Sequence, residues 1–306
     1  MNYELEKGIV LKGVGSFYQV LLADGDIKTC QLRGKLRKSE TEGVYPGDYV
    51  KISAAEAGVG GTMVVEGMID NVLPRINRLL RPKVANIDQV LIVLAALDPL
   101  PDYGLVDKLL VQAECFGIEP AICGNKIDLL NDEERRDFAA GLDTYRQIGY
   151  PVFLFSSKTG EGFTDGRLIT ALKGKISVLA GASGVGKSSI LNRLFPGLTL
   201  STGDISNRLG RGKHTTRHVE MLVIDGGGLV ADTPGFSLLD IPAGLTEQEL
   251  GQYYPEFVAK SDQCRFDTCR HDKEPDCAIR DAVEAGEIDA GRYRRYLKIL
   301  TEIGHK

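Results

Sequence analysis

Residues 181–188, GASGVGKS, constrain the fold of this 306-residue chain more than any other segment. They match G-x-x-x-x-G-K-[ST], follow the aliphatic run 176–180 and open a helical stretch that Pro196 ends. Such a turn lets backbone N–H groups converge on phosphate oxygens at a helix N-terminus, where the helix dipole favours anions. We therefore expect a P-loop in an α/β sheet, in which Lys187 reaches the β- and γ-phosphates and Ser188 ligates Mg²⁺.

The tetrapeptide 125–128, NKID, indicates which base is bound. It follows the expected strand 119–123, and open α/β sheets bind ligands at the carboxyl ends of their strands. Asp128 can accept hydrogen bonds from N1–H and N2–H₂ of guanine, a donor pair that adenine lacks. Asn125 would brace the loop and Lys126 would cover the ring. By itself this sequence also suits a helix-entry turn, but beside a P-loop it predicts guanine binding.

Two further loops follow expected strands. Residues 156–158, SSK, match the loop that backs the guanine in such sheets, and residues 232–235, DTPG, fit the pattern D-x-x-G. Asp232 would hold Mg²⁺ through water, and the Gly235 amide would sense the γ-phosphate. Either loop alone would indicate only an ordinary turn. Together with the P-loop and the NKID tetrapeptide, the two loops indicate a nucleotide site.

The segments between residues 87 and 240 alternate between buried-strand and helical patterns. The expected strands are 89–95, 119–123, 151–155 and 175–180, the expected helices are 104–116, 133–148, 166–172 and 187–195, and a hairpin joins 220–224 to 228–231. This alternation predicts a doubly wound sheet. Past Asp240 the chain becomes polar and helical.

The N-terminal residues instead resemble short strands separated by Gly, Asp and Pro turns, at 8–12, 17–22, 28–32, 48–53 and 61–69. Five strands in so short a segment favour a small closed β-barrel, and an OB-fold ahead of an SH3-like barrel or a plain packing domain. Residues 71–84, with Pro74 and Pro82, are typical of a linker.

The three nucleotide motifs stand in an unusual order. In ordinary GTPases the P-loop comes first and N-K-x-D last, whereas here Asn125 precedes Gly181 and Gly235 follows both. A circularly permuted chain can build the same sheet because domain termini tend to lie close together. In this order the sequence resembles the circularly permuted GTPases, and within them the ribosome small-subunit-dependent GTPase A family, over essentially the whole chain.

The resemblance implies a multidomain α/β protein: an OB-fold RNA-binding barrel over 1–73, a circularly permuted P-loop GTPase domain over 74–240, and a C-terminal helical zinc-binding domain over 241–306. It further implies hydrolysis of GTP to GDP and phosphate in late maturation of the small ribosomal subunit, stimulated by that subunit, with rRNA contacts from the barrel and the tail. A rival hypothesis is a GTP-controlled RNA-binding module that acts by occupancy, with incidental hydrolysis. Because the D-x-x-G loop leads directly into the tail, we expect GTP to reposition the tail.

The tail carries Cys264, Cys269, His271 and Cys277 within fourteen residues. Three thiolates and an imidazole form a common structural zinc set that leaves no position for water, and all four positions match the resembled family. The alternative is three free thiols beside a surface histidine. The remaining cysteines, Cys30, Cys115 and Cys123, lie in or beside apolar stretches and are expected to be small core residues of a cytosolic protein.

The group that activates water is the least determined part of the site. Many GTPases place a glutamine directly after D-x-x-G, where this chain has Phe236, which cannot orient water. The resemblance points to His214 for this role, and contact with RNA phosphate or plain solvation are the alternatives. Either Thr215 or Thr216 would supply a second hydroxyl to Mg²⁺.

The candidate residues form three sets. The catalytic set is His214, Lys187 and Thr216. The GTP/GDP- and Mg²⁺-binding set is Asn125, Lys126, Ile127, Asp128, Ser156, Ser157, Lys158, Gly181, Ala182, Ser183, Gly184, Val185, Gly186, Lys187, Ser188, Ser189, Thr215, Asp232 and Gly235. The set that binds one structural Zn²⁺ is Cys264, Cys269, His271 and Cys277.

Charge and hydropathy limit the partners. The formal net charge is −5, which by itself argues weakly against nucleic acid, but basic clusters occur at 28–38, 75–83 and 292–298, the last interleaved with Tyr293 and Tyr296. No apolar run approaches the roughly 20 residues of a membrane span, and the first residues lack a signal-peptide core. We expect a cytoplasmic monomer that acts on the small ribosomal subunit and its rRNA, without a membrane.

Overall fold

The computed structural model describes residues 5–34, 43–55, 64–80, 82–163, 165–197, 219–232 and 244–305. The described residues fall into two compact units. One draws on Met1–Gln89, Ile169–Leu179 and Gly203–Phe236, and the other on Val90–Leu168, Ala180–Thr202 and Ser237–Lys306.

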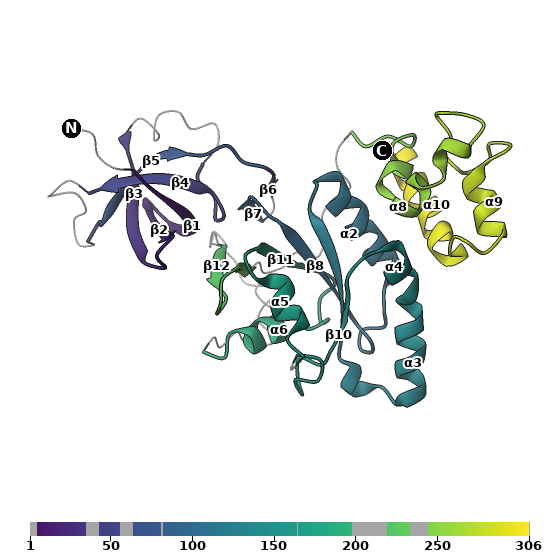
Figure 1. The fold of residues 1–306 in the computed structure, drawn as a ribbon, viewed down its shortest axis with the longest axis horizontal. Coiled ribbons are helices and arrows are strands. Elements are labelled where there is room, and N and C mark those ends of the chain that lie inside the picture. The colour runs from purple at the N-terminus through teal and green to yellow at the C-terminus, as the bar shows by residue number, and fades with distance from the viewer. Residues whose placement is uncertain are drawn as a thin grey trace. The chain divides into compact units, whose positions relative to one another are not determined.

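The N-terminal strands close into a five-stranded barrel of order β1-β2-β3-β5-β4 (Figure 1). Its strands are β1 (Glu6–Val14), β2 (Phe17–Leu22), β3 (Ile27–Leu32), β4 (Tyr49–Ala54) and β5 (Gly67–Val72). An antiparallel β1–β4 pair closes the barrel, and β3 pairs with β5 in parallel. Alternate side chains fill the interior, namely Val10, Val20, Leu22, Cys30, Leu32, Val50, Ile52 and Ile69. The small closed barrel expected from the sequence is confirmed.

The segment 71–84, expected as a linker, overlaps a short hairpin. Its strands are β6 (Arg78–Leu80) and β7 (Lys83–Ala85), which pair antiparallel. The hairpin holds a turn of the barrel, since Ala85 N donates to Pro46 O at 3.0 Å and Asn86 Nδ2 donates to Gly47 O at 2.9 Å. A Cβ at Gly47, whose φ is +88°, would lie 2.1 Å from Ala85 O, so only glycine fits this contact.

The second sheet has six strands in the order β10-β9-β8-β11-β13-β12. They are β8 (Gln89–Ala95), β9 (Glu119–Asn125), β10 (Val152–Leu154), β11 (Ile176–Ala180), β12 (Glu220–Val223) and β13 (Leu229–Asp232). β9 pairs with β10 in parallel, as β11 does with β13, and β12 is the antiparallel partner of β13. Every residue of β8 and β11 is buried, which explains their continuous aliphatic sequences.

The helices between these strands are α2 (Tyr103–Cys115), η1 (Ile127–Leu129), α3 (Asp132–Gly141), α4 (Asp143–Ile148), α5 (Arg167–Leu172) and α6 (Lys187–Leu194). One helix was expected over 133–148, but the chain breaks at Leu142 into α3 and α4. Gly141 is a poor helix former, and its α-carbon lies against Tyr103, whose Oη would be 2.5 Å from a Cβ there. The break therefore occurs where helix propensity is lowest.

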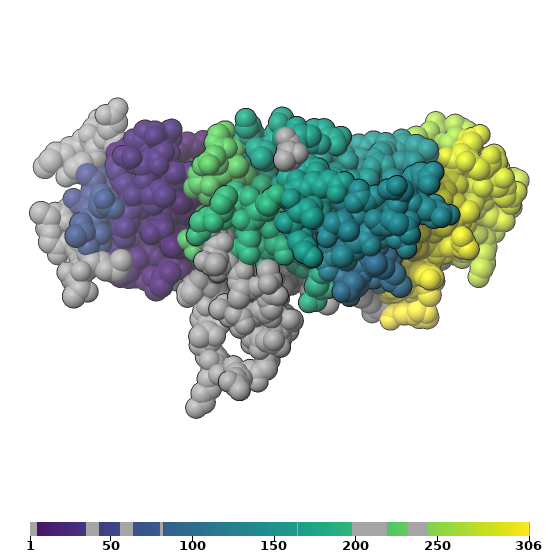
Figure 2. Space-filling model, turned by 90° about the horizontal axis from the view of Figure 1, so that it is seen from below, coloured from purple at the N-terminus to yellow at the C-terminus, as the bar shows by residue number. Residues whose placement is uncertain are grey.

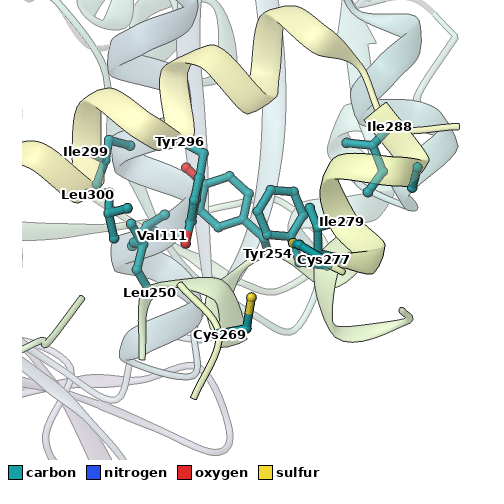
Figure 3. Close-up of a cluster of buried hydrophobic side chains, with 12 residues drawn as sticks. Val111, Leu250, Tyr254, Cys269, Cys277, Ile279, Ile288, Tyr296, Ile299 and Leu300 are labelled. Carbon is teal, nitrogen blue, oxygen red and sulfur yellow. The ribbon is translucent and has the colours of Figure 1, made fainter. Parts of the chain in front are cut away.

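The C-terminal segment, residues 244–305, contains η2 (Leu250–Tyr253), α8 (Pro255–Val258), η3 (Ser261–Gln263), α9 (Ala278–Glu284) and α10 (Ala290–Gly304). Its core surrounds Tyr254 and Tyr296 and includes Val111 from α2 (Figure 3). Among the helices of the described residues, none combines the length and apolar character needed to cross a membrane.

Candidate functional site

The P-loop connects β11 to α6, the strand–loop–helix arrangement that its sequence predicts. Gly181 has φ +139°, and a Cβ there would lie 2.1 Å from Val93 O. Gly186 has φ +98°, and a Cβ there would lie 2.2 Å from the side-chain nitrogen of Asn125. Both positions need glycine for backbone conformation and for space, so the pattern reflects packing of the loop as well as access to phosphate.

Lys187 begins α6 and folds back over the loop. Its Nζ donates to Gly181 O and to Ala182 O, each at 2.7 Å. Burial lowers the pKa of Lys187 to about 8. The two carbonyls thus hold the ammonium group at the mouth of the loop, where phosphate oxygens would supply a stronger, charged acceptor.

Asn125 joins three loops of the site. Its side chain is buried, and its Nδ2 donates to Val185 O at 2.9 Å while its Oδ1 accepts from Ser157 N at 2.9 Å. The amide thereby fixes the NKID loop to the P-loop and to the SSK loop. In the latter, Ser156 Oγ accepts from Thr159 N at 3.0 Å.

A pocket of about 530 Å³ opens between these loops, and Asp128 lies in its wall. Its lining residues are Lys126, Asp128, Leu129, Ser157, Lys158, Gly186, Ser189, Asn192 and Arg193. Asp128 Oδ1 is buried and has no hydrogen-bond partner among the described residues. A buried acceptor without a donor costs about 1–3 kcal/mol, so this oxygen is suited to a ligand that brings its own N–H group.

Lys126 lies beside Asp128 in a left-handed conformation, with φ +65°. Its Nζ donates to Asp98 O. Lys126 is one of the residues that line the pocket.

Arg193 was not identified from the sequence. It projects from α6, and its Nη2 donates to Thr159 O at 3.0 Å in the loop that follows Ser157 and Lys158. A Cβ at Gly160 would lie 1.5 Å from the same nitrogen. Because the two partners are 34 residues apart and neither belongs to a motif, no local signal in the sequence predicts this contact.

Other candidates of the nucleotide site are only partly placed. Asp232 is the last residue of β13. His214, Thr215, Thr216, Gly235 and Phe236 lie outside the described residues. Ser188 and Ser189 belong to the first turn of α6.

The four zinc candidates converge, with all ligand atoms of Cys264, Cys269, His271 and Cys277 within 4.8 Å of one another. The Sγ atoms of Cys264 and Cys277 lie 3.6 and 3.5 Å from His271 Nδ1. In a tetrahedral site with usual Zn–S and Zn–N bonds of about 2.3 and 2.0 Å, sulfur and nitrogen lie about 3.5 Å apart. The donor set therefore fits zinc, which His271 would bind through Nδ1.

The chemistry of the thiols also favours a cation. Burial raises the pKa of Cys269 to about 12 and raises that of Cys277 as well. Buried thiolates at this position need a positive charge to be stable, and a coordinated metal ion supplies one.

Glu274 holds the loop that carries His271. Its carboxylate accepts from the backbone N–H groups of Arg270, Asp272 and Lys273 at 3.0–3.1 Å. Burial opposes the charged form, but these donors outweigh it and lower the pKa of Glu274 to about 2. The backbone of His271, at φ +58°, is thus held in place by a residue that the ligand pattern did not reveal.

Several members of the expected basic clusters are used inside the protein. Arg75 Nε lies 2.6 Å from the fully buried Asp48, and Arg292 is 1% exposed. Tyr296 is also fully buried, with its hydroxyl donating to Arg270 O at 2.6 Å, so its ring is not open to stacking on a base. These side chains pair with residues far away in the sequence, which composition alone does not reveal.

Comparison with known proteins shows two matching families. The RsgA GTPase family matches residues 72–242, and the RsgA N-terminal domain family matches residues 7–61. "Small ribosomal subunit biogenesis GTPase RsgA" of Moorella thermoacetica is 44% identical over 297 residues, covering 97% of each chain. The protein of that name from Bacillus pumilus is 45% identical over 303 residues, covering 98% of each.

Two solved structures share the fold over nearly the whole chain. YjeQ from Thermotoga maritima has a TM-score of 0.84 at 38% identity, covering 99% of this chain and 100% of that one. YloQ, described as a circularly permuted GTPase, has a TM-score of 0.82 at 37% identity, covering 99% of this chain and 96% of that one. The match over more than half of the chain, with relatives of this identity, shows that the chain belongs to the RsgA GTPase family.

Proposed function

We propose that this protein hydrolyses GTP as a factor in late maturation of the small ribosomal subunit, and that the subunit stimulates hydrolysis. The names of its relatives and its family support this assignment. The observation that carries the choice of nucleotide is the buried Oδ1 of Asp128, which lies in a pocket next to the P-loop and has no hydrogen-bond partner in the described part of the chain. Guanine supplies the two N–H donors that this carboxylate needs, and adenine does not.

In this proposal each residue of the nucleotide site has a separate role. Lys187 exchanges its two carbonyl partners for phosphate oxygens, and Asn125 keeps the three loops in register. Ser188 and Asp232 would hold Mg²⁺, together with Thr215 or Thr216. A bound Mg²⁺ would neutralise charge that develops on the phosphates.

His214 would act on the attacking water. Its place in the sequence, between the P-loop helix and the β12–β13 hairpin, is where the first switch of such a sheet belongs. Because the phenyl ring of Phe236 cannot orient water, the attacking water must be oriented by His214 or by a group from the ribosome.

The metal would be structural. Cys264, Cys269, His271 and Cys277 fill a tetrahedral shell, so no coordination position is open to substrate. Zinc there would connect Cys264 and Cys277, at the two ends of the loop, and would brace the C-terminal segment.

The partner, location and domain limits follow from the same proposal. The partner is the small ribosomal subunit with its rRNA, which the protein would bind as a monomer in the cytoplasm. The proposed divisions are an RNA-binding barrel over 1–73, a GTPase domain over 74–240 and a zinc-binding domain over 241–306. Exposed cations such as Arg294 and Lys298 on α10 support an RNA-facing surface on the last of these.

The experiment is steady-state GTP hydrolysis with and without purified small subunits, at one fixed salt concentration. A large acceleration by the subunit supports the assembly GTPase. The second candidate, a GTP-controlled RNA-binding module with incidental hydrolysis, is favoured by Phe236 and predicts binding to the subunit without acceleration. An equal rate with and without subunits would overturn the first proposal.

A further inference from the structure

Four charged side chains meet where the C-terminal segment packs on helices α2 and α4. Asp107 of α2 is fully buried, and Arg292 of α10 is 1% exposed. Arg292 Nη1 donates to Asp107 Oδ1 at 2.7 Å, and its Nε donates to Glu256 Oε1 of α8 at 2.5 Å. Arg295 donates to the other oxygen of Asp107. Two carboxylates and two guanidinium groups thus balance in charge.

The neutral rings around this quartet come from both sides of the junction. Tyr145 of α4 donates its hydroxyl to Asp107 Oδ1 at 2.7 Å. The guanidinium carbon of Arg292 lies 5.4 Å from the ring centre of Tyr145 and 4.6 Å from that of Tyr254. Arg292 is therefore enclosed by two carboxylates and two aromatic rings, an arrangement that fixes its position and direction.

Apolar packing surrounds the charged groups. Val111 of α2 belongs to the buried cluster of the C-terminal segment, with Tyr254, Tyr296 and Leu300, and Cys115 packs against it. Figure 3 shows Val111 among these side chains. On the face seen in Figure 2, the yellow surface of the C-terminal helices continues directly into the blue-teal surface of the helices that precede the P-loop. The junction resembles a protein core more than a contact between tethered domains.

We propose that the quartet of Asp107, Glu256, Arg292 and Arg295 locks residues 244–305 onto α2 and α4, so that they move as one rigid body in every nucleotide state. A buried charge cannot leave its partners without an uncompensated charge remaining in the interior. The lock therefore opposes the expectation, drawn from the order of the motifs, that GTP repositions the tail. Rearrangements that follow GTP binding or hydrolysis must arise elsewhere in the chain.

The test is backbone hydrogen exchange of the full-length, zinc-loaded protein. Arg292→Met leaves Asp107 and Glu256 with one guanidinium group, and should accelerate exchange in α8 and α10 by about a hundredfold to a thousandfold. Adding Glu256→Gln neutralises the carboxylate that Arg292 alone paired among the described residues and leaves the Asp107–Arg295 pair intact, so it should recover at least about tenfold of that loss. The matched control is Lys108→Met, at the position that follows Asp107 on α2. It removes the exposed ion pair with Glu302 and should change exchange less than about threefold.

A second arm uses the unaltered protein and does not depend on any variant folding. Exchange is compared without nucleotide, with GDP and with a non-hydrolysable GTP analogue, and protection in α2, α8 and α10 should be the same in all three. The proposal is overturned if the analogue changes exchange in α8 and α10 relative to α2, or if Arg292→Met behaves like Lys108→Met. Protection of the P-loop in the same data reports nucleotide binding separately, so failure of the proposed function would be recognised as such.

Discussion

Replacing Asp128 with asparagine isolates the contact that selects the base. The substitution keeps the size of the side chain but removes its charge and turns one acceptor into an N–H₂ donor. Guanine N1–H and N2–H₂ both need acceptors here, so at least one of them is left facing a donor. Xanthine carries a carbonyl oxygen at C2, and the new amide can donate to it.

The size of the effect follows from the state of Asp128. Its Oδ1 is buried and unpartnered among the described residues, so the bond formed by guanine replaces no bond within the protein. Hydrogen bonds to charged groups contribute about 1.5–3 kcal/mol each. Losing one of two such bonds, with a buried donor left unpaired, gives about 3 kcal/mol, or a loss of roughly 150-fold in affinity for GTP and GDP.

The assay is calorimetric titration of the unaltered protein and of Asp128→Asn with GDP and with xanthosine diphosphate, both with Mg²⁺. We expect the preference to reverse in the variant. The matched control is Asp132→Asn, an exposed acid in the first turn of α3, which should change GDP affinity less than about twofold. Unchanged GDP affinity in Asp128→Asn would refute the assignment of this carboxylate to guanine.

Three further outcomes are expected. Burial lowers the pKa of Lys187 to about 8, so GTP affinity should be full below pH 8 and fall by up to tenfold per pH unit above it. The reason is that the free protein loses the positive charge that phosphate would stabilise. A flat profile in GTP titrations between pH 7 and 9.5 would contradict this. Elemental analysis should find about one zinc per chain, and Cys269→Ala should lose it; a wild-type protein that is folded and free of metal would exclude the zinc site. Glu274→Ala should weaken zinc affinity by about 10- to 100-fold in a chelator competition, whereas Glu287→Ala, an exposed acid of the same segment, should leave it unchanged.

The parts of this protein that the sequence predicts well are those whose physics is local. A glycine at 181 or 186 is required by backbone conformation and close packing of the loop itself, and Asn125 contacts loops that motifs already mark. The four metal ligands lie within fourteen residues, so their spacing alone brings them near one another. Short runs between turn residues likewise predict the strands of the barrel, and continuous aliphatic runs predict the buried strands of the larger sheet.

What could not be predicted depends on partners far away in the chain. Arg75 and Arg292 resemble surface cations in the sequence because nothing local marks Asp48 or Asp107 as their partners. The same holds for the hairpin at 78–85, whose short strands gain support from a turn of the barrel. Arg193 belongs to no motif, yet it supports the loop beside the base pocket. Tertiary pairing decides these positions.

The central claim is that the pocket beside the P-loop takes guanine through Asp128. The most direct measurement is competition for the unaltered protein between GDP and ADP in the presence of Mg²⁺. Because a site built to bond to specific N–H donors rejects a ligand that lacks them by about 10⁴-fold or more, we predict that ADP at millimolar concentration does not displace GDP. Displacement by ADP at a concentration within about tenfold of that needed for unlabelled GDP would contradict the account.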